Sequence, residues 1–205
     1  MRWRWAYRFE RRETPTDLME LTVTFQACGF HLKNPGTGRI TLLSPEGDQI
    51  ESSEPELAAL LRRDTAVRFQ WWIDDCLDVF CSIERLPNNV TRHSLELGLL
   101  NEENLNRFAD ALVASVGRSV AFNESVGAVI EPLHYGDFDA DEWTAFFLNS
   151  DRLPTWPQIL IGNEDRMKTI QGVPAPYVES KDGEWRVLRY PTFLPHPLRA
   201  ADVNV

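Results

Sequence analysis

The residues best suited to chemistry in this chain surround His134. Asp137 and Asp139 follow it within five positions, and an imidazole beside carboxylates is an arrangement that supports acid–base catalysis or metal binding. None of the four histidines stands in the His-x-x-x-His spacing of a zinc site, and the chain contains no Gly-x-Ser-x-Gly or Cys-x-x-Cys motif. An enzyme of unrecognised type centred on His134 and Asp137 stays open as an alternative, and no cofactor is expected.

The same segment partly follows the pattern of a calcium loop. With Asp137 as position one, aspartates occupy positions one, three and five, as such a loop requires. Position six is then Glu142 where glycine is needed, and position twelve is Leu148 where glutamate is needed. A helix over 140–148 explains the segment better, with Asp139 as its N-cap and Glu142 as the third-position partner. No metal site is expected.

The elements that position these residues are clearest over about 66–99, where the sequence predicts a three-strand meander. Odd-numbered apolar residues lie on one face of the first two strands. Pairing like faces sets Trp71 opposite Val79 across a three-residue loop, 74–76. The same rule sets Ile83 opposite His93 across the next loop. His93 is therefore expected on the apolar face of the sheet.

The other face of the meander is polar except for Trp72 and Phe80. These two residues are diagonal neighbours in the predicted register, so they form one aromatic patch. Two interpretations are open: another part of the chain covers the patch, or the patch is exposed and binds a partner. The polar residues of this face are Arg68, Gln70, Asp78, Ser82, Glu84, Arg92, Ser94 and Glu96.

Three helices are predicted to pack the sheet. The first spans 54–63 and begins with a capping box formed by Ser53 and Glu56. The second spans 102–117, after Asn101 as its cap, and carries an apolar stripe. The third is the helix over 140–148.

Strand patterns complete an α+β fold with a mostly antiparallel sheet. Alternation predicts a hairpin from strands at 3–9 and 19–25, and the Asp182-Gly183 pair predicts a second hairpin near the end of the chain. We expect a single domain over 1–190 and a proline-rich C-terminal tail over 191–205.

The chain is acidic. Its 205 residues carry 31 Asp and Glu against 21 Lys and Arg, a net charge of −10, and eight of the acids lie within 131–165 beside one base. Such a charge disfavours nucleic acid and anionic membranes as partners and favours a basic protein. The chain shows neither a signal peptide core nor an apolar run of about eighteen residues, and its three cysteines are unpatterned. A cytoplasmic protein is expected.

The order of elements over roughly 54–118 resembles that of small α+β proteins that act by binding other proteins. The acidic Asp-x-x-Glu-Trp helix start at 139–143 adds to this likeness, which extends to secretion chaperones and to bacterial immunity proteins of polymorphic toxin systems. The immunity-protein resemblance implies an antitoxin in bacterial competition that neutralises a cognate toxin domain by covering its active site. A secretion chaperone or adaptor, which binds an extended segment, is the other binding alternative.

The predicted partner-binding residues combine the aromatic patch with the acidic segment. Aromatic side chains supply affinity and acidic ones speed association with a basic toxin domain. The predicted residues are Trp72, Phe80, Asp137, Asp139, Asp141, Glu142 and Trp143.

Overall fold

Alternating apolar residues form the strands of this protein, and apolar residues at helical spacing form its helices. The computed structural model describes residues 4–10, 17–87, 89–117, 125–131, 140–148, 153–170, 173, 177–182 and 185–191. The strands are β1 Trp5–Glu10, β2 Ile40–Leu43, β3 Gln49–Ser52, β4 Ala66–Trp72, β5 Asp78–Leu86, β6 Val90–Glu96, β7 Ser125–Ile130, β8 Ile159–Asn163, β9 Val178–Asp182 and β10 Trp185–Arg189. The helices are α1 Asp17–Ala27, α2 Glu54–Arg63, α3 Glu102–Gly117, α4 Ala140–Leu148 and α5 Glu164–Lys168.

The described strands join into one antiparallel sheet in the order β3-β2-β4-β5-β6-β1-β7-β8-β10-β9. Helices and this sheet together confirm the predicted α+β class. The predicted meander is β4, β5 and β6, and its register is also confirmed, because Trp71 pairs with Val79 and Ile83 pairs with His93. His93 is buried on the apolar face, as the register required.

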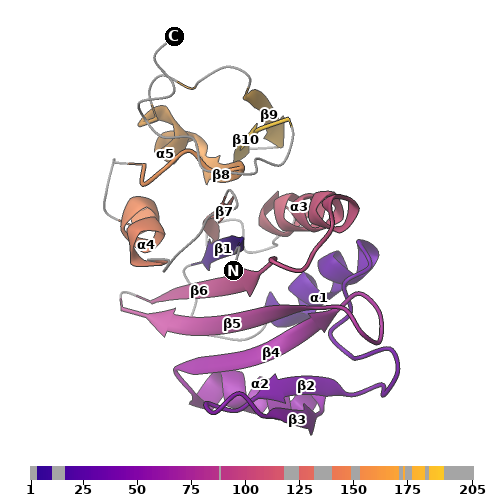
Figure 1. Cartoon of the computed structure of the whole chain (residues 1–205). Helices are drawn as coiled ribbons and strands as arrows, with labels where there is room; N and C mark the ends of the chain where they lie inside the picture. The colour runs from indigo at the N-terminus through magenta and orange to yellow at the C-terminus, as the bar shows by residue number, and fades with distance from the viewer. Residues whose placement is uncertain are drawn as a thin grey trace.

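Helices lie on both faces of the sheet (Figure 1). On the first face, α1, α2 and α3 cover the larger core, which extends from Ile40 in β2 to Val187 in β10. On the second face, α4 and α5 cover a smaller core that includes Phe9 in β1 and Leu188 in β10. The second core therefore occupies only the part of the sheet that begins near β1.

The three predicted helices have the predicted bounds, and two of their starts show the expected caps. At α2, the Glu56 carboxylate accepts the Ser53 backbone N–H and the Ser53 hydroxyl, both at 2.8 Å. At α3, the Asn104 N–H donates to Asn101 Oδ1 at 2.9 Å. The predicted cap of α4, Asp139, lies outside the described residues.

The strand predicted over 19–25 is wrong, because this segment belongs to helix α1. In the helix, Leu18, Leu21 and Phe25 share one side and pack on the first core, while Val23 is 67% exposed. Strand β1 consequently has no hairpin partner next to it in the sequence. It pairs instead with β6 on one side and β7 on the other, so neither of its edges is open. Both of its faces are buried, because Ala6 lies in the first core and Phe9 in the second.

Strand β7 approaches α4 and β8 closely at Gly127. The residue has a φ of +154°, a conformation that side-chain-bearing residues rarely adopt. A Cβ at this position would clash with the Phe147 ring and lie 2.5 Å from the Ile161 carbonyl oxygen. Glycine is therefore required for α4 to pack on this part of the sheet.

The C-terminal hairpin predicted at Asp182 is β9 and β10, in which Asp182 pairs with Trp185. Residues 192–205, most of the predicted tail, lie outside the described residues. Among the helices that the structure describes, none has both the length and the apolar character that a bilayer span requires.

Candidate functional site

Helix α4 carries part of the predicted partner-binding set. Asp141 and Glu142 lie in its first turn and are exposed. Trp143 points inward instead: it is 1% exposed, and its indole N–H donates to Glu131. Trp143 is thus a core residue of the free chain and cannot contact a partner without unfolding α4. Asp137 lies outside the described residues.

His134 and Asp139 also fall outside the described residues, so the alternative enzyme site and the helix cap stay predictions.

The two residues of the aromatic patch on the meander, Trp72 and Phe80, differ in burial. Trp72 is only 7% exposed, and its backbone N–H and C=O exchange hydrogen bonds with His31 at 2.8 and 2.7 Å. Phe80 is half-buried and lies diagonal to Trp72, since Gln70 is its direct partner. The chain therefore covers Trp72, which was the first of the two interpretations. Phe80 keeps some accessible surface.

The side chains on the second face of the sheet change from mostly polar to apolar between β6 and β1. One row of paired residues crosses seven strands and shows the change: Arg68, Ser82, Ser94, Tyr7, Val129, Leu160 and Leu188. The apolar members belong to the core under α4 and α5. The other members belong to what we call the polar half, which consists of Arg68, Gln70, Trp72, Asp78, Phe80, Ser82, Glu84, Arg92, Ser94 and Glu96.

Arg92 lies at the edge of the polar half and connects it to α4 through hydrogen bonds. Its guanidinium donates to the Glu84 carboxylate at 2.6 Å, to Asp141 at 3.1 Å and to the Thr144 hydroxyl at 3.0 Å. Burial alone would lower the pKa of Arg92, but the hydrogen bonds to Glu84 and Asp141 and the negative charges of these two residues together raise it. The polar half and the acidic first turn of α4 are therefore adjacent. The sequence had suggested a common role for them only from their acidic and aromatic composition.

Two carboxylates of the polar half flank Phe80. Glu96 pairs directly with Phe80 across β5 and β6, and Asp78 precedes Phe80 by two residues on the same face. Burial raises the pKa of Asp78, and burial followed by repulsion from Asp78 raises the pKa of Glu96. Among the described residues, no lysine or arginine forms an ion pair with either of them.

Gln70 completes this group from β4. The side chain is 6% exposed, and its Nε2 donates to Asp78 Oδ2 at 2.7 Å. Because a carboxylate only accepts hydrogen bonds, the amide nitrogen must face Asp78. The amide oxygen Oε1 is left buried with no donor in the described part of the chain.

Sequence analysis placed Gln70, Asp78 and Glu96 on this face but not in the predicted site. The signal was present, because the register that brings Phe80 next to Trp72 also brings it next to these residues.

A second charged group is buried within the first face. The Glu10 carboxylate accepts from the Arg8 guanidinium and lies 2.8 Å from His93 Nε2, and all three side chains are at least nine-tenths buried. Burial alone would raise the pKa of Glu10, but Arg8 and then His93 hold it well below its usual range. This group joins β1 to β6 inside the core.

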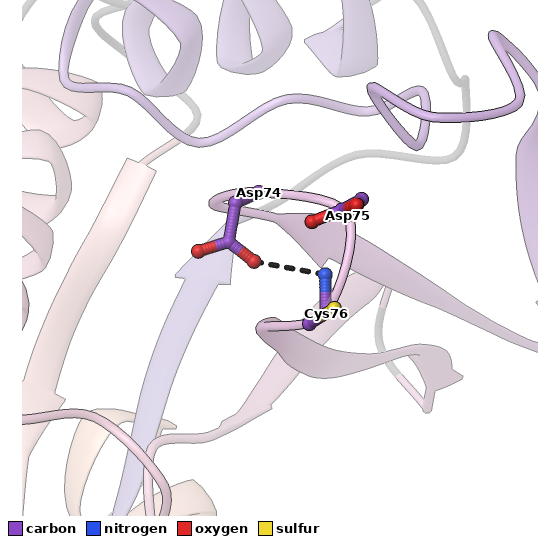
Figure 2. Close-up of side chains that lie close together, drawn as sticks. All are labelled: Asp74, Asp75 and Cys76. Atoms are coloured by element: carbon purple, nitrogen blue, oxygen red, sulfur yellow. Dashed lines mark hydrogen bonds between the residues drawn. The ribbon is translucent and has the colours of Figure 1, made fainter.

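The turn between β4 and β5 gathers the exposed side chains of Asp74, Asp75 and Cys76 (Figure 2), whose potential ligand atoms lie within 4.8 Å of one another. Asp74 Oδ1 accepts the backbone N–H groups of Cys76 and Leu77, each at 2.8 Å, which is the usual way an aspartate closes a tight turn. A hydrogen bond to Asp75 raises the pKa of the Cys76 thiol. The hydrogen bonds account for the cluster as part of the turn.

A cavity of about 310 Å³ lies between α1, the segment after it and the start of α2. Thr22, His31 and Asn34 line it, and the Lys33–Glu54 ion pair, 2.7 Å long, belongs to its wall. Both ions of this pair are about half-exposed, so water screens their charges.

No known protein family and no curated protein matches the chain. Among solved structures, the chain is similar to one described as Pseudomonas aeruginosa T6SS protein PA0821, with a TM-score of 0.54 and 10% sequence identity. The match covers 94% of this chain and 67% of that one. The likeness is one of fold.

Proposed function

We propose that this chain is an immunity protein, which binds one cognate toxin domain and covers its active site. The observation that carries the proposal is the polar half of the second face. The helices described on that face pack over the neighbouring strands, and α4 borders the polar half with the exposed acids Asp141 and Glu142. Within the polar half, Gln70, Trp72, Ser82 and Ser94 are buried. The members that keep accessible surface are Arg68, Asp78, Phe80, Glu84, Arg92 and Glu96. A protein partner is the ligand that fits a partly apolar and acidic surface of this kind.

The charges of this surface favour a basic partner. Its described acids outnumber its described bases, and two of the acids, Asp78 and Glu96, form no ion pair with a described residue. Complementary charge accelerates association, and a central aromatic residue such as Phe80 is the type of side chain that anchors an interface. The acids of the polar half and of the first turn of α4 are Asp78, Glu84, Glu96, Asp141 and Glu142, and the bases are Arg68 and Arg92.

The similarity in fold to a chain described as a T6SS protein is consistent with a secretion-related role. A cytoplasmic inhibitor of a secreted toxin is one such role. The proposal therefore agrees both with the chemistry of the surface and with the structural neighbour.

Affinity capture of the intact chain from its native host, at low and at high salt, tests the proposal. We expect to capture one basic protein in a one-to-one ratio, with faster association at low salt. The captured protein should arrest growth when it is expressed alone, and co-expression of this chain should relieve that arrest. An E142Q variant should bind the captured protein more slowly, whereas D165N on α5 serves as a charge-matched control because Asp165 is 94% exposed and belongs neither to α4 nor to the polar half.

Two results would remove the proposal. One is a captured protein whose toxicity or activity is unchanged by this chain. The other is binding only to an unfolded or extended form of the partner, which would indicate the chaperone alternative.

A further inference from the structure

We infer that Phe80, with Asp78 and Glu96 on either side, forms a receptor for an arginine side chain that the partner inserts. This inference rests on the proposed function, because it specifies what the partner must present to the polar half. The site is a chemically defined position within the broader acidic surface.

The register of the sheet fixes the arrangement of the site. Gln70, Phe80 and Glu96 occupy one row across β4, β5 and β6, and Asp78 lies one pair further along β5 on the same face. Phe80 is thus the central side chain, with an amide on one side and a carboxylate on the other. Cross-strand neighbours of this kind lie about 5 Å apart and diagonal ones about 7 Å apart.

Each polar group of the site has unused capacity to accept hydrogen bonds. Asp78 takes one bond from Gln70, and Glu96 has no ion pair with a described residue. Gln70 Oε1 is buried and has no donor among the described residues, although buried polar atoms normally have one. The Nε2 atom of the same amide donates to Asp78, so the Gln70 side chain is anchored beside the two carboxylates.

A guanidinium matches these groups better than any other side chain. It offers five donors in one plane, which suits two carboxylates, and its flat face stacks on an aromatic ring. Its positive charge also offsets the repulsion between the half-buried Asp78 and Glu96, which no described cation of the free chain compensates through an ion pair. The same groups repel an acidic partner segment.

The test uses two blocked tripeptides, acetyl-Gly-Arg-Gly-amide and its citrulline counterpart, which has the same shape without the charge. Carbon-13 spectra of the side-chain carboxyls report binding to the intact chain. We expect the arginine peptide to shift the Asp78 and Glu96 signals with half-saturation in the range of about 1–10 mM, typical of a single contact. It should also lower the apparent pKa of Glu96, while the citrulline peptide binds at least about tenfold more weakly.

Variants separate the site from general acidity. The isosteric pair D78N and E96Q should lose the arginine response together, while E164Q with D165N, which removes the same charge on α5, should retain it. If the double variant fails to fold, the single E96Q is measured instead. Equal binding of the two peptides, or an arginine response that survives in the Asp78 and Glu96 variants, would overturn the inference.

The outcome is independent of the proposed function. Failure of the peptides removes the arginine receptor and leaves the immunity proposal to the capture experiment. Peptide binding in a chain that neutralises no toxin would instead remove the immunity proposal and retain the receptor.

Discussion

Glu10 and Glu96 are carboxylates of the same sheet in opposite electrostatic situations. Glu10 is fully buried between Arg8 and His93, which hold its pKa well below the usual range. Glu96 is half-buried and forms no ion pair with a described residue, and burial, followed by repulsion from Asp78, raises its pKa. Removing the charge from each should therefore change stability in opposite directions.

The substitution E96Q is expected to stabilise the free protein at pH 7 by roughly 0.5 kcal/mol, the scale of changes at partly exposed sites. A raised folded-state pKa means that stability is lost as the pH rises through it, and the amide avoids this loss. Urea unfolding from pH 3 to pH 8 measures the effect. The difference from wild type should vanish below about pH 4.3, where the carboxyl is neutral in both states; a destabilised E96Q at pH 7 would contradict the account.

The substitution E10Q is expected to destabilise the protein at pH 7 by about 3–5 kcal/mol, because it leaves the buried Arg8 without its counter-ion. The depressed pKa of Glu10 gives a contribution that is present above about pH 4.3 and declines as the pH falls. The difference in unfolding free energy between E10Q and the wild type should therefore become smaller as the pH falls below this value. E51Q, on the exposed edge strand β3, is the control and should unfold like wild type.

At the residue scale, pattern reasoning located His93 and Phe80 correctly but could not establish what each one meets. Alternation places a residue on a face, whereas burial depends on which distant segment packs there. Trp72 and Trp143 were predicted at an interface because both interrupt or border polar stretches. The structure buries them, since the bulk of an indole favours the core.

Helix α1 shows how a local pattern can favour the wrong element. Thr22, Val23 and Thr24 are β-branched, and Leu21, Val23 and Phe25 alternate, so the segment has a strand-like sequence. The helical spacing of Leu18, Leu21 and Phe25 was also present, and packing against α3 decides between the two. Tertiary contact of this kind regularly overrides weak intrinsic preference. The caps of α2 and α3, by contrast, are local, and sequence predicted both.

Packing of α4 on β7 gives a prediction at the element scale. G127A is expected to cost at least about 2 kcal/mol of unfolding free energy, because the added methyl meets the Phe147 ring and the Ile161 backbone oxygen at a strained φ. G162A on β8 is the matched control, since its methyl would meet the flexible Met167 side chain. Thermal unfolding of the two variants compares them, and equal melting temperatures would show that α4 can shift to make room.

Across the whole molecule, the described helices cover one face of the sheet from β2 to β10, whereas on the other face the described helices α4 and α5 pack mainly over β1, β7, β8 and β10. The sequence predicted the meander, the helices α2, α3 and α4, and the polar character of this face. It could not predict that β1 joins the meander to the C-terminal strands, because pairing between strands that are far apart in sequence leaves no local mark. The extent of the polar half depends on that pairing.

Charge on α4 should affect the rate of partner binding more than its lifetime. Combining D141N with E142Q is expected to lower the association rate constant by about three- to tenfold at low salt and to change the dissociation rate little, because exposed rim charges act mainly by steering. Stopped-flow mixing with the captured partner measures both rates. The E164Q/D165N pair is the control, and an equal slowing by both pairs would indicate only an effect of net charge.

The central position of β1 also has a consequence for how the chain folds. Its partners are β6, which ends at residue 96, and β7, which ends at residue 130, so β1 can pair on both sides only after residue 130 has been synthesised. Strands β2 to β6 can assemble earlier through short connections. Because contacts so distant in sequence slow folding, the joining of β1 is expected to be the late, slow step, during which the edges of β6 and β7 are exposed to aggregation.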